Sequence, residues 1–153
     1  MDAMQSLLTL LAHAERERDA ALAELRRRQI DARNAQTQAE QLQTYRREYE
    51  QRWSGEFSRS GGIAIVQCYQ GFVTRLGEAI DQQTRIALTA AQRLEHAERI
   101  WRESELRVAS VGKLIGRRNV ALRALEGRRE QKLLDEQATR IAWERRGDRL
   151  APA

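Results

Sequence analysis

Apolar side chains recur at alternating steps of three and four residues along almost the whole chain, and this spacing constrains its fold most strongly. The first run has eleven apolar residues among fourteen positions, and the other three are arginines. The fourteen positions are Leu7, Leu11, Ala14, Arg18, Ala21, Leu25, Arg28, Ala32, Ala35, Ala39, Leu42, Arg46, Tyr49 and Trp53. A second run, from Val66 to Leu125, has fifteen among eighteen. This is the spacing of a coiled-coil seam, and the only proline, Pro152, lies next to the end. The fold class predicted is therefore all-α.

The two runs are separated by the only adjacent glycine pair, Gly61-Gly62, which follows Ser58 and Ser60. Adjacent glycines lose the most entropy on ordering and end a helix, and serines accept hydrogen bonds from the first turn of the next helix. We predict helix 1 over about 3–57, a turn over 58–62 and helix 2 over about 63–146.

The position of this turn sets a register between the helices. If the chain folds back there, residues that face each other have numbers that sum to about 121, so Leu7 faces Leu114 and Met4 faces Arg117. Helix 1 then begins within a turn or two of where the second seam stops, near Leu125, and a straight rod gives no reason for that agreement. We predict a single domain, 1–153, which is an antiparallel coiled-coil hairpin with an overhang from about Arg118.

Charge adds a hint about partners. Charged residues make up 32% of the chain, aromatic residues 5%, and the net charge is +5. Residues 117–153 hold 10 basic and 6 acidic side chains, so most of the excess lies in the overhang. A basic coiled coil that binds nucleic acid is one alternative function and a structural homodimeric rod is another. Because charges of both signs flank the seams, we expect no nucleic acid partner.

The sequence carries no pattern that points to catalysis. It lacks glycine-rich phosphate loops, its histidines His13 and His96 lie far apart without zinc-ligand spacing, and Cys68 is its single cysteine. We expect no enzyme activity, no cofactor and no metal site. The N-terminus does not resemble a signal peptide, and no apolar stretch is long enough to span a membrane. We expect a cytoplasmic protein without direct membrane insertion.

Near the turn, side chains at spacings of four, three and four form one stripe on each helix. The 121 register brings these two stripes together as one patch, which is called the tip patch below: Gln38, Leu42, Tyr45, Tyr49, Phe72, Leu76, Ala79 and Gln83. Tyr45, Phe72 and Ala79 lie off the seam, so part of the patch is expected to be exposed. Grouped exposed aromatics favour a protein contact, whereas wide packing at the tip is the alternative.

Two features of helix 2 leave alternatives open. Leu134, Ala138 and Ile141 form a short stripe out of frame with the seam, which indicates either a frayed tail or a binding surface. Gly112 and Gly116 lie one turn apart, and they favour either close packing against helix 1 or a bend.

Several stretches, in order along the chain, resemble the flagellar export protein FliJ family. They are Tyr45-Arg46-Arg47-Glu48-Tyr49, the run from Tyr69 to Gln83, Trp101-Arg102-Glu103 and the run from Arg129 to Glu136. The resemblance implies a part of the flagellar type III export apparatus at the cytoplasmic face of the inner membrane. It also implies an antiparallel coiled coil similar to the stalk of rotary ATP synthases.

The resemblance implies three kinds of partner: a hexameric export ATPase, the cytoplasmic domain of the membrane export gate protein, and export chaperones. The family's gate-contacting positions match the eight residues of the tip patch, and Gln83 is the weakest match because relatives can carry histidine there. By the stalk analogy the open end enters the ATPase ring, where we expect contacts from Leu134, Ala138, Ile141 and Arg145. The function predicted is a non-enzymatic stalk that links the ATPase ring to the gate and escorts chaperones.

Overall fold

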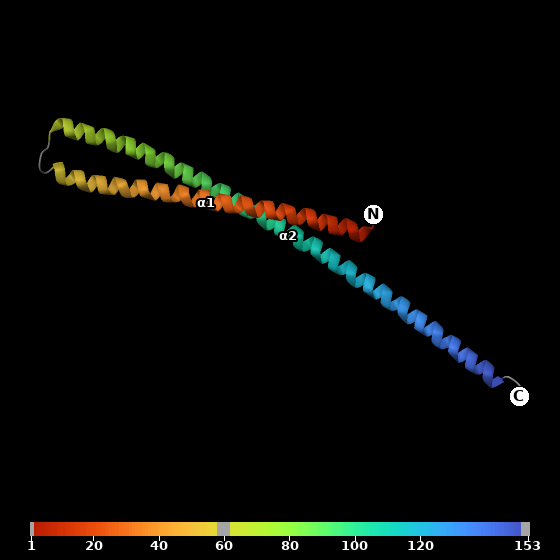
Figure 1. Cartoon of the computed structure of the whole chain (residues 1–153). Helices are drawn as coiled ribbons and strands as arrows, with labels where there is room; N and C mark the ends of the chain where they lie inside the picture. The colour runs from red at the N-terminus through yellow and green to blue at the C-terminus, as the bar shows by residue number, and fades with distance from the viewer. Residues whose placement is uncertain (1, 58–61, 151–153) are drawn as a thin grey trace. The chain divides into compact units, whose positions relative to one another are not determined.

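Two long helices account for nearly all of the chain. A computed structural model describes residues 2–57 and 62–150, in which α1 spans Ala3–Phe57 and α2 spans Ile63–Leu150 (Figure 1). The bounds of α1 agree with the prediction, whereas α2 continues four residues beyond the expected end at 146. The predicted turn falls mostly on residues 58–61, which lie outside the described residues, together with the two serines expected to cap the second helix.

The described helix starts have identifiable backbone partners. The Asp2 carboxylate accepts a hydrogen bond from the backbone N–H of Met4 at 2.9 Å, and the Asp2 carbonyl accepts one from the N–H of Ser6 at 3.1 Å. Asp2 is therefore an N-cap, which explains why α1 begins at Ala3. At the start of α2 the Gly62 carbonyl accepts hydrogen bonds from Ile65 and Val66 at 3.1 and 3.2 Å.

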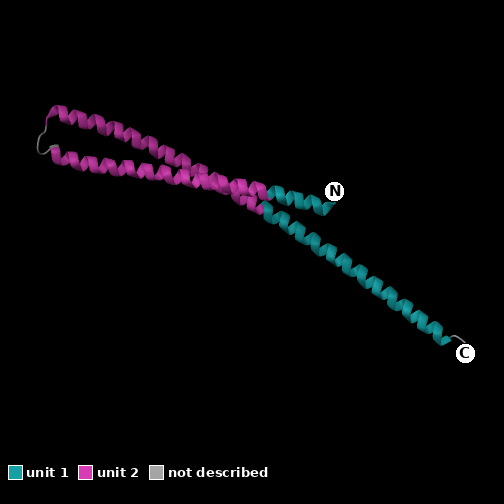
Figure 2. Ribbon diagram, in the orientation of Figure 1, with its two compact units in different colours: residues 1–14, 107–153 teal, residues 15–106 magenta. Residues whose placement is uncertain are grey.

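The chain divides into two compact units, which are described separately (Figure 2). Unit 2 comprises residues 15–106, in which parts of α1 and α2 lie side by side and run in opposite directions (Figure 1). Unit 1 comprises residues 1–14 and 107–153. The assignment of all 153 residues to a single domain stays a prediction.

Direct contacts in unit 2 confirm the predicted register. The Gln83 side-chain amide donates to Gln38 Oε1 at 3.1 Å and to the Ala35 carbonyl at 3.4 Å. The ring centroids of Tyr49 and Phe72 are 4.3 Å apart. The numbers of both facing pairs sum to 121. The helical hairpin is thus confirmed, and since α1 and α2 pair within one chain, a second copy is not required to cover the seam.

The buried seam of unit 2 is thin because most of its residues are small. Its buried apolar side chains are Ala21, Leu25, Ala35, Ala39, Leu76, Ile80, Ala87 and Ala97. Among the described residues, none of the large side chains is completely buried. Alanine allows two helices to approach closely but removes little apolar area from water, so the few leucines and isoleucines should contribute most of the stability.

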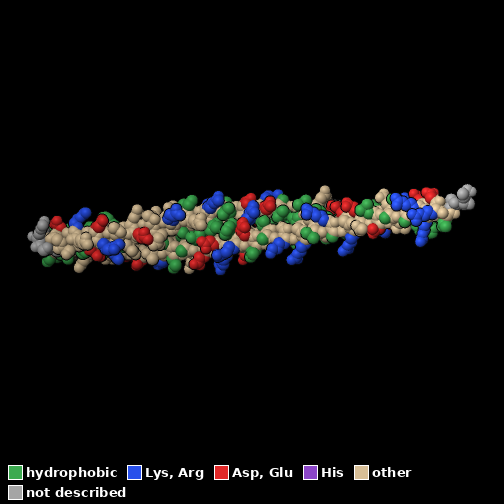
Figure 3. Space-filling view, turned by 90° about the horizontal axis from the view of Figure 1, so that it is seen from below, with side chains coloured by type: hydrophobic (Ala, Val, Ile, Leu, Met, Phe, Trp, Pro, Cys, Tyr) green, Lys and Arg blue, Asp and Glu red, His purple; other side chains and the backbone are tan. Residues whose placement is uncertain are grey.

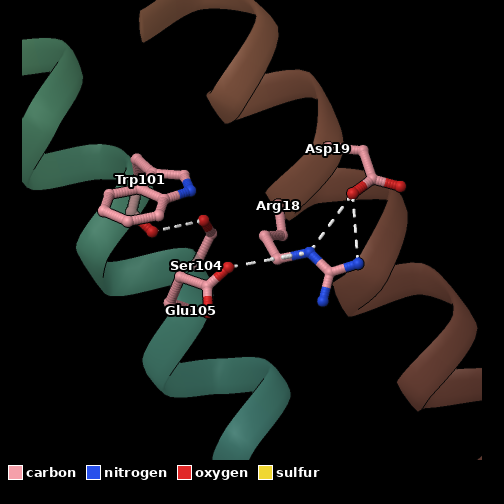
Figure 4. Close-up of polar contacts among 5 residues, drawn as sticks. All are labelled: Arg18, Asp19, Trp101, Ser104 and Glu105. Carbon is pink, nitrogen blue, oxygen red and sulfur yellow. Dashed lines mark hydrogen bonds and ion pairs between the residues drawn. The ribbon is translucent and has the colours of Figure 1, made fainter.

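Two polar residues that interrupt the seam, Arg18 and Ser104, have local partners (Figure 4). Arg18 Nε lies 3.8 Å from a carboxylate oxygen of Glu105 on α2, and the same guanidinium donates to Asp19 at 3.1 and 3.2 Å. The Ser104 hydroxyl, in a residue only 3% exposed, donates to the Trp101 carbonyl at 2.6 Å. These bonds explain how arginine and serine occupy seam positions without leaving those groups unpaired.

In unit 1 the seam ends earlier than its sequence pattern. Val111 is 8% exposed, but every residue from Gly116 to Leu150 is exposed. The reason is that α1 begins at Ala3. The positions of α2 that extend past the start of α1 have no apolar seam opposite them. Apart from the chain neighbours and the adjacent turns of α2 backbone, no atom of the described residues lies within 4 Å of where a Cβ would stand at Gly112 or Gly116. The close-packing interpretation of these two glycines is therefore wrong, and the bend interpretation stays a prediction.

The overhang begins later than expected at Arg118. Residues from both helices of unit 1 line one groove of about 780 Å³: Ala3, Ser6, Leu7, Leu10, Leu114, Arg117, Arg118, Ala121, Leu122 and Leu125. Leu7 and Leu114, predicted to face each other, both lie in it. Helical side chains lean towards the N-terminus of their own helix, so Leu122 and Leu125 lean back towards the start of α1. The part of α2 without a neighbour in unit 1 therefore starts after Leu125.

Replacing Leu25 by alanine is expected to lower the thermal unfolding midpoint clearly, because Leu25 is 6% exposed in a seam that has few large side chains. Losing a buried leucine costs about 3 kcal/mol of unfolding free energy. The matched control is Leu88→Ala, since Leu88 is 60% exposed on the same pair of helices. Thermal melts followed by circular dichroism compare the two, and equal melting midpoints would contradict the proposed seam.

Candidate protein-binding surfaces

The tip patch is built around three aromatic rings in unit 2. Phe72 lies 4.3 Å from Tyr49 and 6.3 Å from Tyr45, where the rings meet nearly edge to face at 75°. The rings of Tyr45 and Tyr49 are 6.2 Å apart. Tyr45 and Tyr49 are one helical turn apart on α1, and the register places Phe72 opposite them, so the predicted stripes do meet.

The structure adds two more aromatics to this cluster, Tyr69 and Trp53, which lie outside the predicted tip patch. Tyr69 stacks on Tyr49 at 5.7 Å with an interplanar angle of 11°, and the Trp53 ring lies 5.9 Å from Tyr69 and 5.8 Å from Tyr49. The signal was present, because Trp53 is four residues after Tyr49 and Tyr69 is three before Phe72. Aromatic pairs at these distances stabilise beyond simple burial, so the cluster holds Tyr49 and Phe72 in place.

Exposure separates the patch residues into those that face solvent and those that form the seam. Tyr45 is 48% exposed, and Gln38 and Ala79 are also exposed. Leu42, Tyr49, Phe72 and Gln83 are half-buried, whereas Leu76 is buried at 8%. The expectation that part of the patch is exposed is confirmed. Tyr45 and Ala79 are available to a partner, whereas Leu76 belongs to the buried seam.

A second surface lies on the exposed part of α2 in unit 1. The four predicted ATPase-contacting residues follow spacings of four, three and four and thus share one helix face: Leu134, Ala138, Ile141 and Arg145. Leu134 is 60% exposed and Ile141 is 49% exposed. We call these four residues the tail stripe.

Arginines surround the end of the tail stripe. A shallow groove there is lined by Ala138, Ile141, Ala142, Arg145, Arg146 and Arg149. Figure 3 shows Lys and Arg side chains gathered close to the described end of α2. An apolar floor with guanidinium groups at its edge suits a partner surface that combines apolar and acidic side chains.

The sequence analysis missed a third surface, in the middle of unit 2. We call it the arginine groove; it has a volume of about 510 Å³ and is lined by Arg28, Asp31, Ala35, Gln82, Arg85, Ile86, Thr89, Ala90 and Arg93. On its α1 side, Arg28 forms ion pairs with Glu24 at 2.8 Å and with Asp31 at 3.9 Å. The hydrogen bond from Arg28 lowers the pKa of Glu24 below its usual value, and Arg27 adds to this effect.

Other side chains that could react or bind a metal are scattered. Cys68 is exposed as a free thiol. Within residues 2–57 and 62–150, no three His, Cys, Asp or Glu side chains come together as a metal site. Neither described helix contains a segment that is both long and apolar enough to cross a membrane.

Comparison with known proteins gives concordant matches. The family model for the Flagellar FliJ protein matches residues 4–147. The Flagellar FliJ protein of Salmonella typhi is 34% identical over 143 residues, which cover 90% of this chain and 93% of that protein. The Flagellar FliJ protein of Escherichia coli (strain K12) is 33% identical over 142 residues, with the same coverage. No solved structure matches the chain significantly.

Proposed function

The chain belongs to the FliJ family of flagellar proteins, and on that premise we propose that it is a stalk of the flagellar protein export apparatus. In this role it links the hexameric export ATPase to the cytoplasmic domain of the membrane export gate protein. It also escorts export chaperones, and it works at the cytoplasmic face of the inner membrane without inserting into it.

The tip patch is the observation that carries this proposal. The resemblance assigns its eight positions to gate contact, and the register brings the two helical stripes together without reference to that resemblance. The Gln38–Gln83 hydrogen bond of 3.1 Å and the Tyr49–Phe72 distance of 4.3 Å support this arrangement. An exposed tyrosine supported by other rings is the kind of residue that contributes most to protein interfaces.

The tail stripe supports the second contact, with the ATPase. It presents Leu134 and Ile141 to solvent on the part of α2 after Leu125, where every described residue is exposed. Exposing large apolar side chains to water does not stabilise a helix, so their presence here favours a partner that covers them.

The role is non-enzymatic. Catalytic sites are concave and bury most of a bound ligand, whereas the grooves described here run along the outside of helices. Grooves of this kind suit contacts with helices and loops of other proteins.

A bridging assay tests the proposed function. The gate cytoplasmic domain is immobilised, and the export ATPase is added with or without the full chain. We expect the chain to increase ATPase capture about tenfold or more, because each partner binds a different surface of the chain. Capture that is unchanged by the chain, although the chain binds each partner separately, would rule out the linking role.

A further inference from the structure

The arginine groove continues the tip patch along the same face of unit 2. On α2, the outward positions Phe72, Ala79, Ile86 and Arg93 follow one another at steps of seven residues. The same step on α1 leads from Tyr45 to the exposed residues Gln38 and Asp31 and then to Glu24. A seven-residue step returns to nearly the same side of a helix, so a partner seated on the tip patch has the groove directly beside it.

The charges of the groove are incompletely matched within the chain. Arg28 pairs with both carboxylates on the α1 side, Glu24 and Asp31. On the α2 side, neither Arg85 nor Arg93 lies within ion-pair distance of any carboxylate of the described residues. Two guanidinium groups therefore remain available to acidic side chains of a partner.

An exposed apolar residue lies between these two arginines. Ile86 is 47% exposed, and Ile100, two steps of seven further along α2, is 43% exposed. Arg85 and Arg93 are eight residues apart, about 12 Å along the helix. An apolar spot flanked by two cations at this distance complements one face of an acidic amphipathic helix. Such a helix would carry carboxylates seven or eight residues apart and an apolar side chain close to one of them, because Ile86 directly follows Arg85.

We propose that the arginine groove binds an acidic amphipathic helix of the partner that docks on the tip patch, which is the gate domain under the proposed function. Charge complementarity at Arg85 and Arg93 selects an acidic helix, and Ile86 provides the apolar contact between them. This inference rests on the proposed function, because continuity with the tip patch is what assigns the groove to that partner.

A charge-reversal variant tests the groove. In the full chain, Arg85→Glu with Arg93→Glu is expected to weaken binding of the gate domain about tenfold and to flatten its salt dependence, because two attractive pairs become repulsive. The matched control is Arg99→Glu with Arg102→Glu, which makes the same charge change at exposed positions of α2 outside the groove. Titration calorimetry at two salt concentrations measures both, and circular dichroism verifies equal helix content. Equal weakening in the two variants would reduce the effect to net charge and overturn the proposal.

Site-specific cross-linking identifies the occupant. A photoreactive residue replaces Ile86 in one variant and Leu88 in the other, since Leu88 lines a different groove on the opposite side of the seam. Mass spectrometry should map the Ile86 cross-link to a helical gate segment with carboxylates seven or eight residues apart. A cross-link to a segment without such carboxylates, or none at Ile86, would overturn the proposal. If the gate domain fails to bind the unmodified chain at all, the proposed function fails instead, so the two failures are distinguishable.

Discussion

Replacing Tyr45 and Phe72 by alanine together is expected to abolish measurable binding to the gate cytoplasmic domain while helix content stays unchanged. Tyr45 is 48% exposed, and its ring lies 6.3 Å from that of Phe72, which in turn lies 4.3 Å from Tyr49. Truncating one such aromatic at an interface typically costs about 2–4 kcal/mol, and losing two would weaken a micromolar complex to a dissociation constant of about 1 mM or more. Titration calorimetry measures the binding, and circular dichroism measures the helix content.

The control for this variant removes exposed apolar side chains from unit 2 without touching the tip patch. Leu88→Ala with Leu106→Ala serves this purpose, because both leucines are at least 60% exposed and neither belongs to the tip patch. Its binding should stay within about twofold of the unmodified chain. If the variant with alanine at Tyr45 and Phe72 loses helix content, the variant Ala79→Arg is used in its place. Position 79 is exposed, so an arginine there can block docking without opening the seam. If the gate domain still binds the variant with alanine at Tyr45 and Phe72 and also the Ala79→Arg variant, the tip patch is not the docking surface.

Most of the fold followed from periodicity and from one interruption of it. The alternation of three and four residues identified the seam, and all fourteen predicted seam positions of α1 are buried or half-buried. The register could be predicted because an antiparallel pair has one free parameter, the position of the turn. Gln38 and Gln83 hydrogen bond where that parameter places them.

The end of the seam was harder to place because it depends on where α1 starts. The pattern of α2 continues through Leu122 and Leu125, yet both are more than 40% exposed. A side chain's spacing indicates the face it occupies, but its burial requires a neighbour at the same height. At Leu122 and Leu125 only the first residues of α1 are nearby, because α1 begins at Ala3, capped by Asp2.

Of the two candidate surfaces in unit 2, one could be predicted from the sequence and the other could not. The tip patch could be predicted because each stripe is visible in one helix, and the register joins them. The arginine groove could not, because its character depends on which arginine is neutralised. Sequence alone does not show that Arg28 pairs with Glu24 and Asp31, while Arg85 and Arg93 remain without carboxylates of the described residues.

Removing residues 127–153 is expected to abolish association with the export ATPase and to leave gate binding unchanged. This cut removes the tail stripe but keeps Arg118, Leu122 and Leu125, which line the groove with the start of α1. Every described residue that is lost is exposed, so the thermal unfolding midpoint of the shortened chain should stay within a few degrees of the full chain. Co-sedimentation with the ATPase, gate-domain titration and thermal melts measure the three expectations.

A longer deletion separates the binding role of the tail stripe from any structural role. Removing residues 118–153 also takes Leu122 and Leu125 from the groove, so it should lower the melting midpoint as well as abolish ATPase association. Leu134→Asp with Ile141→Asp keeps the full length but places two charges on the stripe, and it should match the shorter deletion in ATPase binding. If the 127–153 deletion still captures the ATPase like the full chain, the tail stripe is not the contact. The groove at Leu7, Leu122 and Leu125 would then be the surface of unit 1 to test, because it is the apolar surface that the shorter deletion leaves intact.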